Sequence, residues 1–162
     1  MKTAIKSCYP AALAMLMIMS ASQASATDTT TSSGLMVKTS VAEVIGVREI
    51  ESGKFEQGIR KSKAALAKTS NMSLRKPLLD NLCVAHLAIK NMEQANQYCH
   101  AAISTGKASA ISYNNRAVMH YVLGNLDASL EDLEAASEFA SFQNMVERNL
   151  RIVNQQNILS KN

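Results

Sequence analysis

The chain has 162 residues, no tryptophan and a formal net charge of +4. This length suits one domain with a core of its own, packed mainly by methionine, leucine, isoleucine and alanine. Two of the basic residues, Lys2 and Lys6, lie in a stretch that we expect to be removed, which lowers the net charge to about +2. So small a positive excess does not support nucleic-acid binding.

The N-terminal stretch, residues 1–26, is typical of a secretory signal peptide. A positive start precedes a short apolar run over residues 11–19, and Ala24-Ser25-Ala26 forms a cleavage site of small residues. Cleavage after Ala26 predicts a periplasmic or secreted protein of the bacterial cell envelope, the alternative being a retained N-terminal membrane anchor. No later apolar run approaches the ~20 residues that a membrane span needs, so we expect no stable membrane insertion.

We interpret residues 27–38, which are rich in threonine and serine, as a disordered lead-in. Ser40 and Glu43 then predict a capping box for a first helix. Turns are predicted at Gly53-Lys54, Lys90-Asn91 and Gly124-Asn125, because a helix most easily ends on a residue that tolerates positive φ. No strand-like alternation follows, which predicts an all-α fold.

The second half of the chain repeats itself at a fixed interval. Residues 79–103 moved forward by 34 fall on residues 113–137, with Asn81 on Asn115 and His86 on His120. A further copy lies upstream at an interval of 37 residues. We place the three additional residues in the polar stretch 67–73. Self-similarity at this period is typical of one supersecondary unit that is copied and stacked.

Each copy is predicted to be a pair of helices around one of the three turns. In the last copy, apolar residues recur at helical spacing over residues 112–123 and resume after the turn with Leu126, Leu130 and Leu133. A single helix predicted over residues 142–157 would then close the stack, because the end of a repeat array needs an outer face that water accepts.

The last copy, with Tyr113 to Val118, Gly124-Asn125, Leu130 and Ala135-Ala136, resembles the tetratricopeptide repeat. Small residues also stand where that family places close helix contacts, at Gly46, Cys83 and Ala117 in first helices and at Ala65, Ala102 and Ala136 in second helices. The resemblance covers residues 39–140 and implies a short solenoid of about three helical hairpins. Together with the capping helix, these hairpins are predicted to form one domain over residues 39–158.

In that family the first helices line a concave groove that binds a protein or peptide. The resemblance places the following residues there as a peptide-binding set: Asp80, Asn81, Val84, Asn114, Asn115, Val118 and Tyr121. Asn81 and Asn115 can each offer a donor and an acceptor to an extended peptide backbone, or can merely satisfy backbone groups between repeats. The predicted function is therefore a non-catalytic protein- or peptide-binding module, without a cofactor.

Cys83 and Cys99 fall on the two helices of one repeat at similar distances from its turn, which predicts a disulfide in an oxidising compartment. Two small core residues are the alternative. A metal site built from Cys83, His86, Cys99 and His100 is a further alternative, although the adjacent Cys99 and His100 cannot easily point at one ion. We predict no metal site.

No phosphate-binding loop, nucleophile elbow or zinc-protease motif occurs in the sequence, which predicts that the protein is not an enzyme. Residues 54–76 are basic and residues 127–138 are acidic. Such stretches are usually solvated helix faces, but they also allow self-association. An assembly subunit that docks through its ends or its charged outer helices is the alternative to groove binding.

Overall fold

The computed structural model describes residues 29–31 and 33–162, and most of this part of the chain is helical. Seven helices occur in it: α1 (Val47–Glu51), α2 (Phe55–Lys68), α3 (Met72–Ala88), α4 (Met92–Ser104), α5 (Ala110–Val122), α6 (Leu126–Ser137) and α7 (Gln143–Ser160). β1 (Thr29–Thr30) and β2 (Met36–Val37) form a small antiparallel pair. The predicted all-helical class is confirmed, whereas the signal peptide predicted over residues 1–26 lies outside the described residues.

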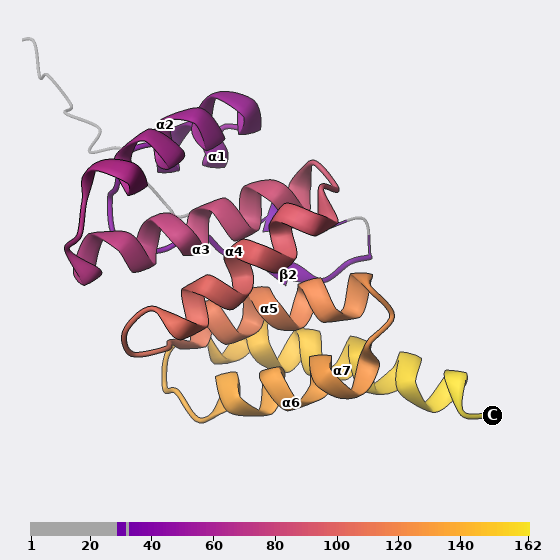
Figure 1. Cartoon of the computed structure of the whole chain (residues 1–162). Coiled ribbons are helices and arrows are strands. Elements are labelled where there is room, and N and C mark those ends of the chain that lie inside the picture. The colour runs from indigo at the N-terminus through magenta and orange to yellow at the C-terminus, as the bar shows by residue number, and fades with distance from the viewer. Residues whose placement is uncertain (1–28, 32) are drawn as a thin grey trace, which may run out of the picture.

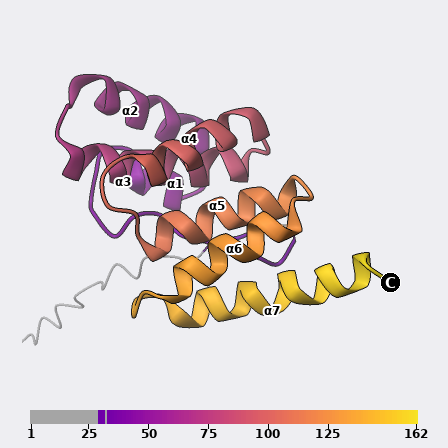
Figure 2. The same ribbon diagram turned by 60° about the horizontal axis from the view of Figure 1, so that its bottom comes forward.

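The helices pack as successive pairs. α1 packs on α2, α3 on α4 and α5 on α6, while α2–α3, α4–α5 and α6–α7 contacts join the pairs and the last helix. Figure 1 shows the pairs one below another, and Figure 2 shows α7 along the end of the stack with its C-terminal part projecting. α3 and α7 each contact α5, and β2 lies against α5 and α7. We call the side formed by α3, α5 and α7 the groove face.

The turns within the three helix pairs lie where the sequence predicts them. Each contains a residue with positive φ: Gly53 at 77°, Lys90 at 57° and Gly124 at 80°. Glycine adopts this conformation without steric cost, and Lys90 is one of two described non-glycine residues that adopt it. The helix predicted over residues 142–157 is also confirmed, since α7 covers it.

The first helix differs from the prediction. α1 begins at Val47 after Gly46, whose φ is 95°, so Ser40 and Glu43 do not cap it. The backbone N–H of Ser40 donates instead to Asn81 on the groove face, and the Glu43 carboxylate pairs with Arg48. The chain is thus not helical at Ser40, and the first helix is only a little more than one turn long.

The N-terminal segment, residues 33–40, also differs from the disordered lead-in predicted over residues 27–38. Leu35 and Val37 are 0% and 1% exposed, and Met36 and Val37 form β2. The backbone carbonyl of Thr31 closes the turn before β2 by accepting a hydrogen bond from the N–H of Gly34. Burial of two branched apolar side chains outweighs the polar composition from which the disorder is predicted.

Ala102 on α4 and Ala136 on α6 are fully buried, in agreement with their predicted place at close helix contacts. Replacing either alanine with leucine is expected to overpack that contact and to destabilise the fold by about 1–3 kcal/mol. Urea denaturation measures the change, and Ala64→Leu on the exposed side of α2 is the matched control. Buried-site variants that unfold at the same urea concentration as the control would contradict this packing.

Candidate peptide-binding groove

Three asparagines on the groove face bind the backbone of the N-terminal segment. We call Asn81 on α3, Asn115 on α5 and Asn149 on α7 the asparagine ladder; its members recur at the interval of the sequence repeat. They contact Ser40, Lys38 and Met36 respectively. Alternate residues of an extended strand point their backbone groups to the same side, so the ladder follows one edge of the segment.

Two members of the ladder bind both backbone groups of one residue. Asn115 accepts from the N–H of Lys38 at 3.0 Å and donates to its carbonyl at 2.8 Å. Asn149 accepts from the N–H of Met36 at 2.9 Å and donates to its carbonyl at 2.8 Å. A side-chain amide that pairs in this way recognises the peptide unit and not the side chain of the bound residue.

The third member is bonded on one side only. Asn81 accepts from the N–H of Ser40 at 2.8 Å, whereas its Nδ2 group is buried and has no hydrogen-bond partner among the described residues. Asn114 strengthens the opposite end of the ladder by donating to the Met36 carbonyl at 2.9 Å and accepting from Asn149 at 2.8 Å. The segment is therefore held most firmly at Met36 and Lys38.

Apolar contacts accompany the ladder. Leu35 and Val37 belong to the same buried cluster as Val84 and Val118, and Tyr121 packs against that cluster. These contacts favour branched apolar side chains at the first and third residues of the sequence Leu35-Met36-Val37.

Two polar side chains of the segment also make contacts. The Lys38 ammonium lies 5.3 Å from the centre of the Phe142 ring, and the Thr39 hydroxyl donates to the Glu51 carboxylate at 2.6 Å. The first contact joins the segment to the loop before α7, and the second joins it to α1. The segment is therefore bound to the helices from Leu35 to Ser40, and not only by the ladder.

The structure brings together the seven residues predicted to bind a peptide, but it does not leave them open. Asp80, Asn81, Val84, Asn114, Asn115 and Val118 are buried, and Tyr121 is half-buried. The N-terminal segment is hydrogen-bonded to Asn81, Asn114 and Asn115. It also belongs to the apolar cluster of Val84 and Val118, so these side chains are not open to a second ligand. Sequence reasoning missed Asn149, although it follows Asn115 at the repeat interval, because the resemblance ends near Ala140.

Asp80 is equivalent to Asn114 of the next repeat but takes another role. Its carboxylate accepts from Lys76 Nζ at 3.0 Å, and the same ammonium donates to Ser109 at 3.1 Å and to Ser112. Burial raises the pKa of Asp80, an effect that the charge of Lys76 opposes. The other carboxylate oxygen is buried without a partner among the described residues. Asp80 and Lys76 thus form a largely buried ion pair within α3 that is hydrogen-bonded to Ser109 and Ser112 at the start of α5.

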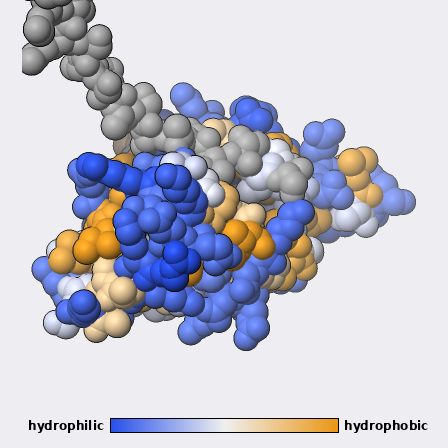
Figure 3. Space-filling view, turned by 90° about the horizontal axis from the view of Figure 1, so that it is seen from above, coloured by the Kyte–Doolittle hydropathy of each residue, from blue (hydrophilic) through white to orange (hydrophobic). Residues whose placement is uncertain are grey.

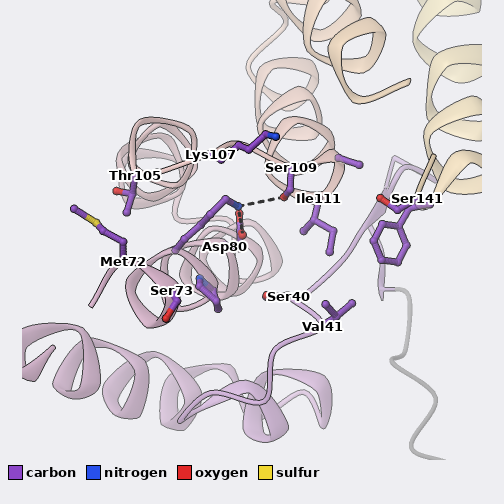
Figure 4. A pocket seen from close by; sticks show the side chains of 15 residues that line it. Ser40, Val41, Met72, Ser73, Asp80, Thr105, Lys107, Ser109, Ile111 and Ser141 are labelled. Carbon is purple, nitrogen blue, oxygen red and sulfur yellow. Dashed lines mark hydrogen bonds and ion pairs between the residues drawn. The ribbon is translucent and has the colours of Figure 1, made fainter. Parts of the chain in front are cut away.

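A cleft of about 670 Å³ opens beside this ion pair. Figure 4 shows Asp80 at its floor, Ser109 and Ile111 on one side, and Ser40 and Val41 where the N-terminal segment ends. Its walls are more apolar than polar, and two lysines line it: Lys76, which is bonded to Asp80 and Ser109, and the exposed Lys107. The cleft therefore extends the groove past Ser40.

Cys83 and Cys99 form a disulfide between α3 and α4, with their Cα atoms 4.9 Å apart. This pairing confirms the predicted bond and suits an oxidising compartment. It also removes the thiolates that a Cys and His metal site would need. His86 instead stacks on Tyr98, with the centres of the two rings 5.3 Å apart. The described residues contain no group of three or more His, Cys, Asp or Glu side chains placed to hold a metal ion.

The two oppositely charged stretches are partly neutralised within the protein. In the basic stretch, residues 54–76, Lys76 pairs with Asp80 and Lys61 with Glu49. In the acidic stretch, residues 127–138, Asp132 receives two hydrogen bonds from Arg116, at 2.8 and 2.6 Å. Fewer charges are therefore free for self-association than the sequence suggests.

Within residues 29–31 and 33–162, none of the helices has the length and apolar character needed to cross a membrane. No protein-family model matches the chain, and no curated protein is significantly similar to it.

Proposed function

We propose that the protein is a non-catalytic, tetratricopeptide-repeat-like module of the cell envelope or the secreted fraction that binds an extended protein segment on its groove face. The asparagine ladder carries this proposal. Its amides pair with peptide groups at every second residue, as an extended ligand of varied sequence requires. The chain's own residues 33–40 occupy the site until another segment replaces them.

Several features support the solenoid part of the proposal. Gly46, Cys83 and Ala117, which are equivalent in the repeats, all lie at helix contacts. The repeat interval continues to Asn149, so α7 occupies the place of the first helix of a fourth unit. The predicted signal peptide and the disulfide both favour an oxidising compartment outside the cytoplasm.

A competing segment must overcome an advantage of proximity. A ligand tethered to its own site acts at an effective concentration of about 1 mM, so an outside peptide with equal contacts binds the intact protein weakly. Weakening the tethered ligand should reveal the site. The double variant Leu35→Asp with Val37→Asp does so, because it places two charges in buried apolar positions without changing the groove.

The experiment measures binding of a labelled peptide with the sequence of residues 33–40 by fluorescence anisotropy. The double variant is expected to bind it at least about tenfold more tightly than the unaltered protein does. A control peptide with aspartate in place of both Leu35 and Val37 should not bind. Equal, undetectable binding to a folded double variant would contradict the proposal.

Docking through charged outer helices is the second candidate, because a filled groove leaves a partner only the outer surface. Lys54, Arg60 and Lys68 are exposed on or beside α2. Reversing these three charges should abolish partner capture if this candidate is right and should leave peptide binding to the groove unchanged.

A further inference from the structure

The N-terminal segment is joined to the helices by a short non-helical hinge, residues 41–46. The hinge begins directly after Ser40, the last residue bound by the asparagine ladder, and ends at Gly46 before α1. The hinge contacts the helices toward its end, where Glu43 pairs with Arg48 and the Ile45 carbonyl accepts from the Ser62 hydroxyl at 3.1 Å. Gly46 packs closely against Gly58 and Ser62 of α2. Val41 and Ala42 precede these contacts. The segment can therefore leave the groove by rotation within the hinge while α1 stays in place.

The hinge exposes apolar side chains. Val41 and Ile45 are 69% and 63% exposed, and Met72 and Leu74 at the start of α3 are exposed nearby. Val41 and Met72 line the cleft beside Asp80, while Ile45 and Leu74 line a second hollow of about 320 Å³. Figure 3 shows hydrophobic patches among hydrophilic atoms on the side seen from above. Grouped exposed apolar residues of this kind mark a surface that a partner covers.

We propose that the N-terminal segment exchanges between two copies of this chain, so that residues 33–40 of each copy lie in the groove of the other. The proposal rests on the proposed function, since it requires that the groove bind a segment from another molecule. A second copy supplies the same Leu35, Val37 and backbone groups, and each groove therefore keeps every contact that it makes in the monomer.

The exchange also accounts for the exposed hinge. In a symmetric pair the two hinges pass each other at the two-fold axis, which brings Val41 and Ile45 of both copies together. The contact between the two hinges is the only one that the monomer lacks. Every other contact of the segment is replaced by the same contact with the other copy. An unrelated partner would have to match the buried positions of Leu35 and Val37 independently, whereas a second copy matches them by identity.

Two complementary variants test the exchange. The segment variant, Leu35→Asp with Val37→Asp, keeps an intact groove; the groove variant, Asn115→Ala with Asn149→Ala, keeps an intact segment. Neither can form an exchanged dimer with itself. An equal mixture can form a heterodimer, in which the segment of the groove variant fills the groove of the segment variant.

Native mass spectrometry distinguishes the species by mass. At about 0.1 mM, within tenfold of a typical effective concentration, the mixture is expected to contain at least tenfold more dimer than either variant alone. Adding Val41→Lys and Ile45→Lys to both should lower the dimer at least tenfold. Circular dichroism checks that both variants fold. If the segment variant is unfolded, Leu35→Ala with Val37→Ala replaces it; if the groove variant is unfolded, the single change Asn115→Ala replaces it.

The outcomes separate the two proposals. A monomeric mixture, with a segment variant that still binds the peptide of residues 33–40, would overturn the exchange and leave the groove function standing. A mixture that stays monomeric with no peptide binding would overturn both. A dimer that forms equally in each variant alone would show that the copies associate through another surface, and would also overturn the exchange.

Discussion

Replacing Lys76 with methionine is expected to destabilise the fold by about 3–5 kcal/mol at neutral pH, because the Asp80 carboxylate would lose the cation that compensates its charge. The Asp80 side chain is only 3% exposed, and one of its oxygens already has no partner among the described residues. Chemical denaturation of the purified protein and the variant measures the difference in free energy of unfolding.

The same variant should respond to pH in a defined direction. Burial raises the pKa of Asp80 in the folded state, so the protonated carboxyl is the form that the fold favours. The contribution of Asp80 to the free energy of unfolding is complete at pH values below the pKa that it has in the unfolded chain. This contribution is lost as the pH rises through the pKa that Asp80 has in the folded protein. Without Lys76 this loss of stability is larger, so the destabilisation by Lys76→Met should grow as the pH rises above about 4, the pKa of aspartate in an unfolded chain.

The double variant Lys76→Met with Asp80→Asn is the control for the buried ion pair. It removes both charges and should recover most of the lost stability, with little dependence on pH. Asparagine is also the residue at the equivalent position of the next repeat, Asn114. A double variant as unstable as Lys76→Met alone would show that shape, and not charge, causes the loss.

Asn115→Ala is expected to destabilise the protein by about 2–4 kcal/mol, because it leaves the buried N–H and carbonyl of Lys38 without the partners that Asn115 supplies. Each buried polar group that loses its partner costs about 1–3 kcal/mol. Asn81→Ala is the matched control, because Asn81 makes one hydrogen bond to the segment and has an unpaired Nδ2.

Urea denaturation of the two alanine variants compares the members of the ladder directly. The cost of Asn81→Ala should be about 1 kcal/mol, clearly below that of Asn115→Ala. Equal costs would mean that the asparagines stabilise their own helices and not the bound segment. The comparison also tests whether the groove asparagines contribute to folding, as their burial and their bonds to the segment predict.

The sequence was sufficient to predict the helices, the turns and the disulfide. Each of them depends on residues that are close together in the sequence, or on the spacing of the repeat. Apolar residues at helical spacing define α5 and α6, and Gly53 and Gly124 mark turns by tolerating positive φ. A spacing that places Cys83 and Cys99 at similar distances from one turn is enough to bring them together in an antiparallel pair.

The start of the first helix could not be predicted in the same way. Ser40 and Glu43 satisfy the local pattern of a capping box, but the backbone N–H of Ser40 is bound by Asn81, which is far away in the sequence. A sequence pattern that spans a single helical turn cannot predict a contact between residues so far apart in the sequence. A local preference of about 1 kcal/mol for a cap is easily outweighed by such tertiary contacts.

The sequence by itself determined that this protein is a set of helix pairs with asparagines recurring at the repeat interval, since helical period and repeat are properties of the residue order alone. Only the tertiary structure decided what those asparagines bind. Residues 33–40 are short and partly polar, which suggests disorder, and nothing local gives them a partner. Stacking of α3, α5 and α7 places three amides along one line, and the buried positions of Leu35 and Val37 make the chain's own segment the occupant.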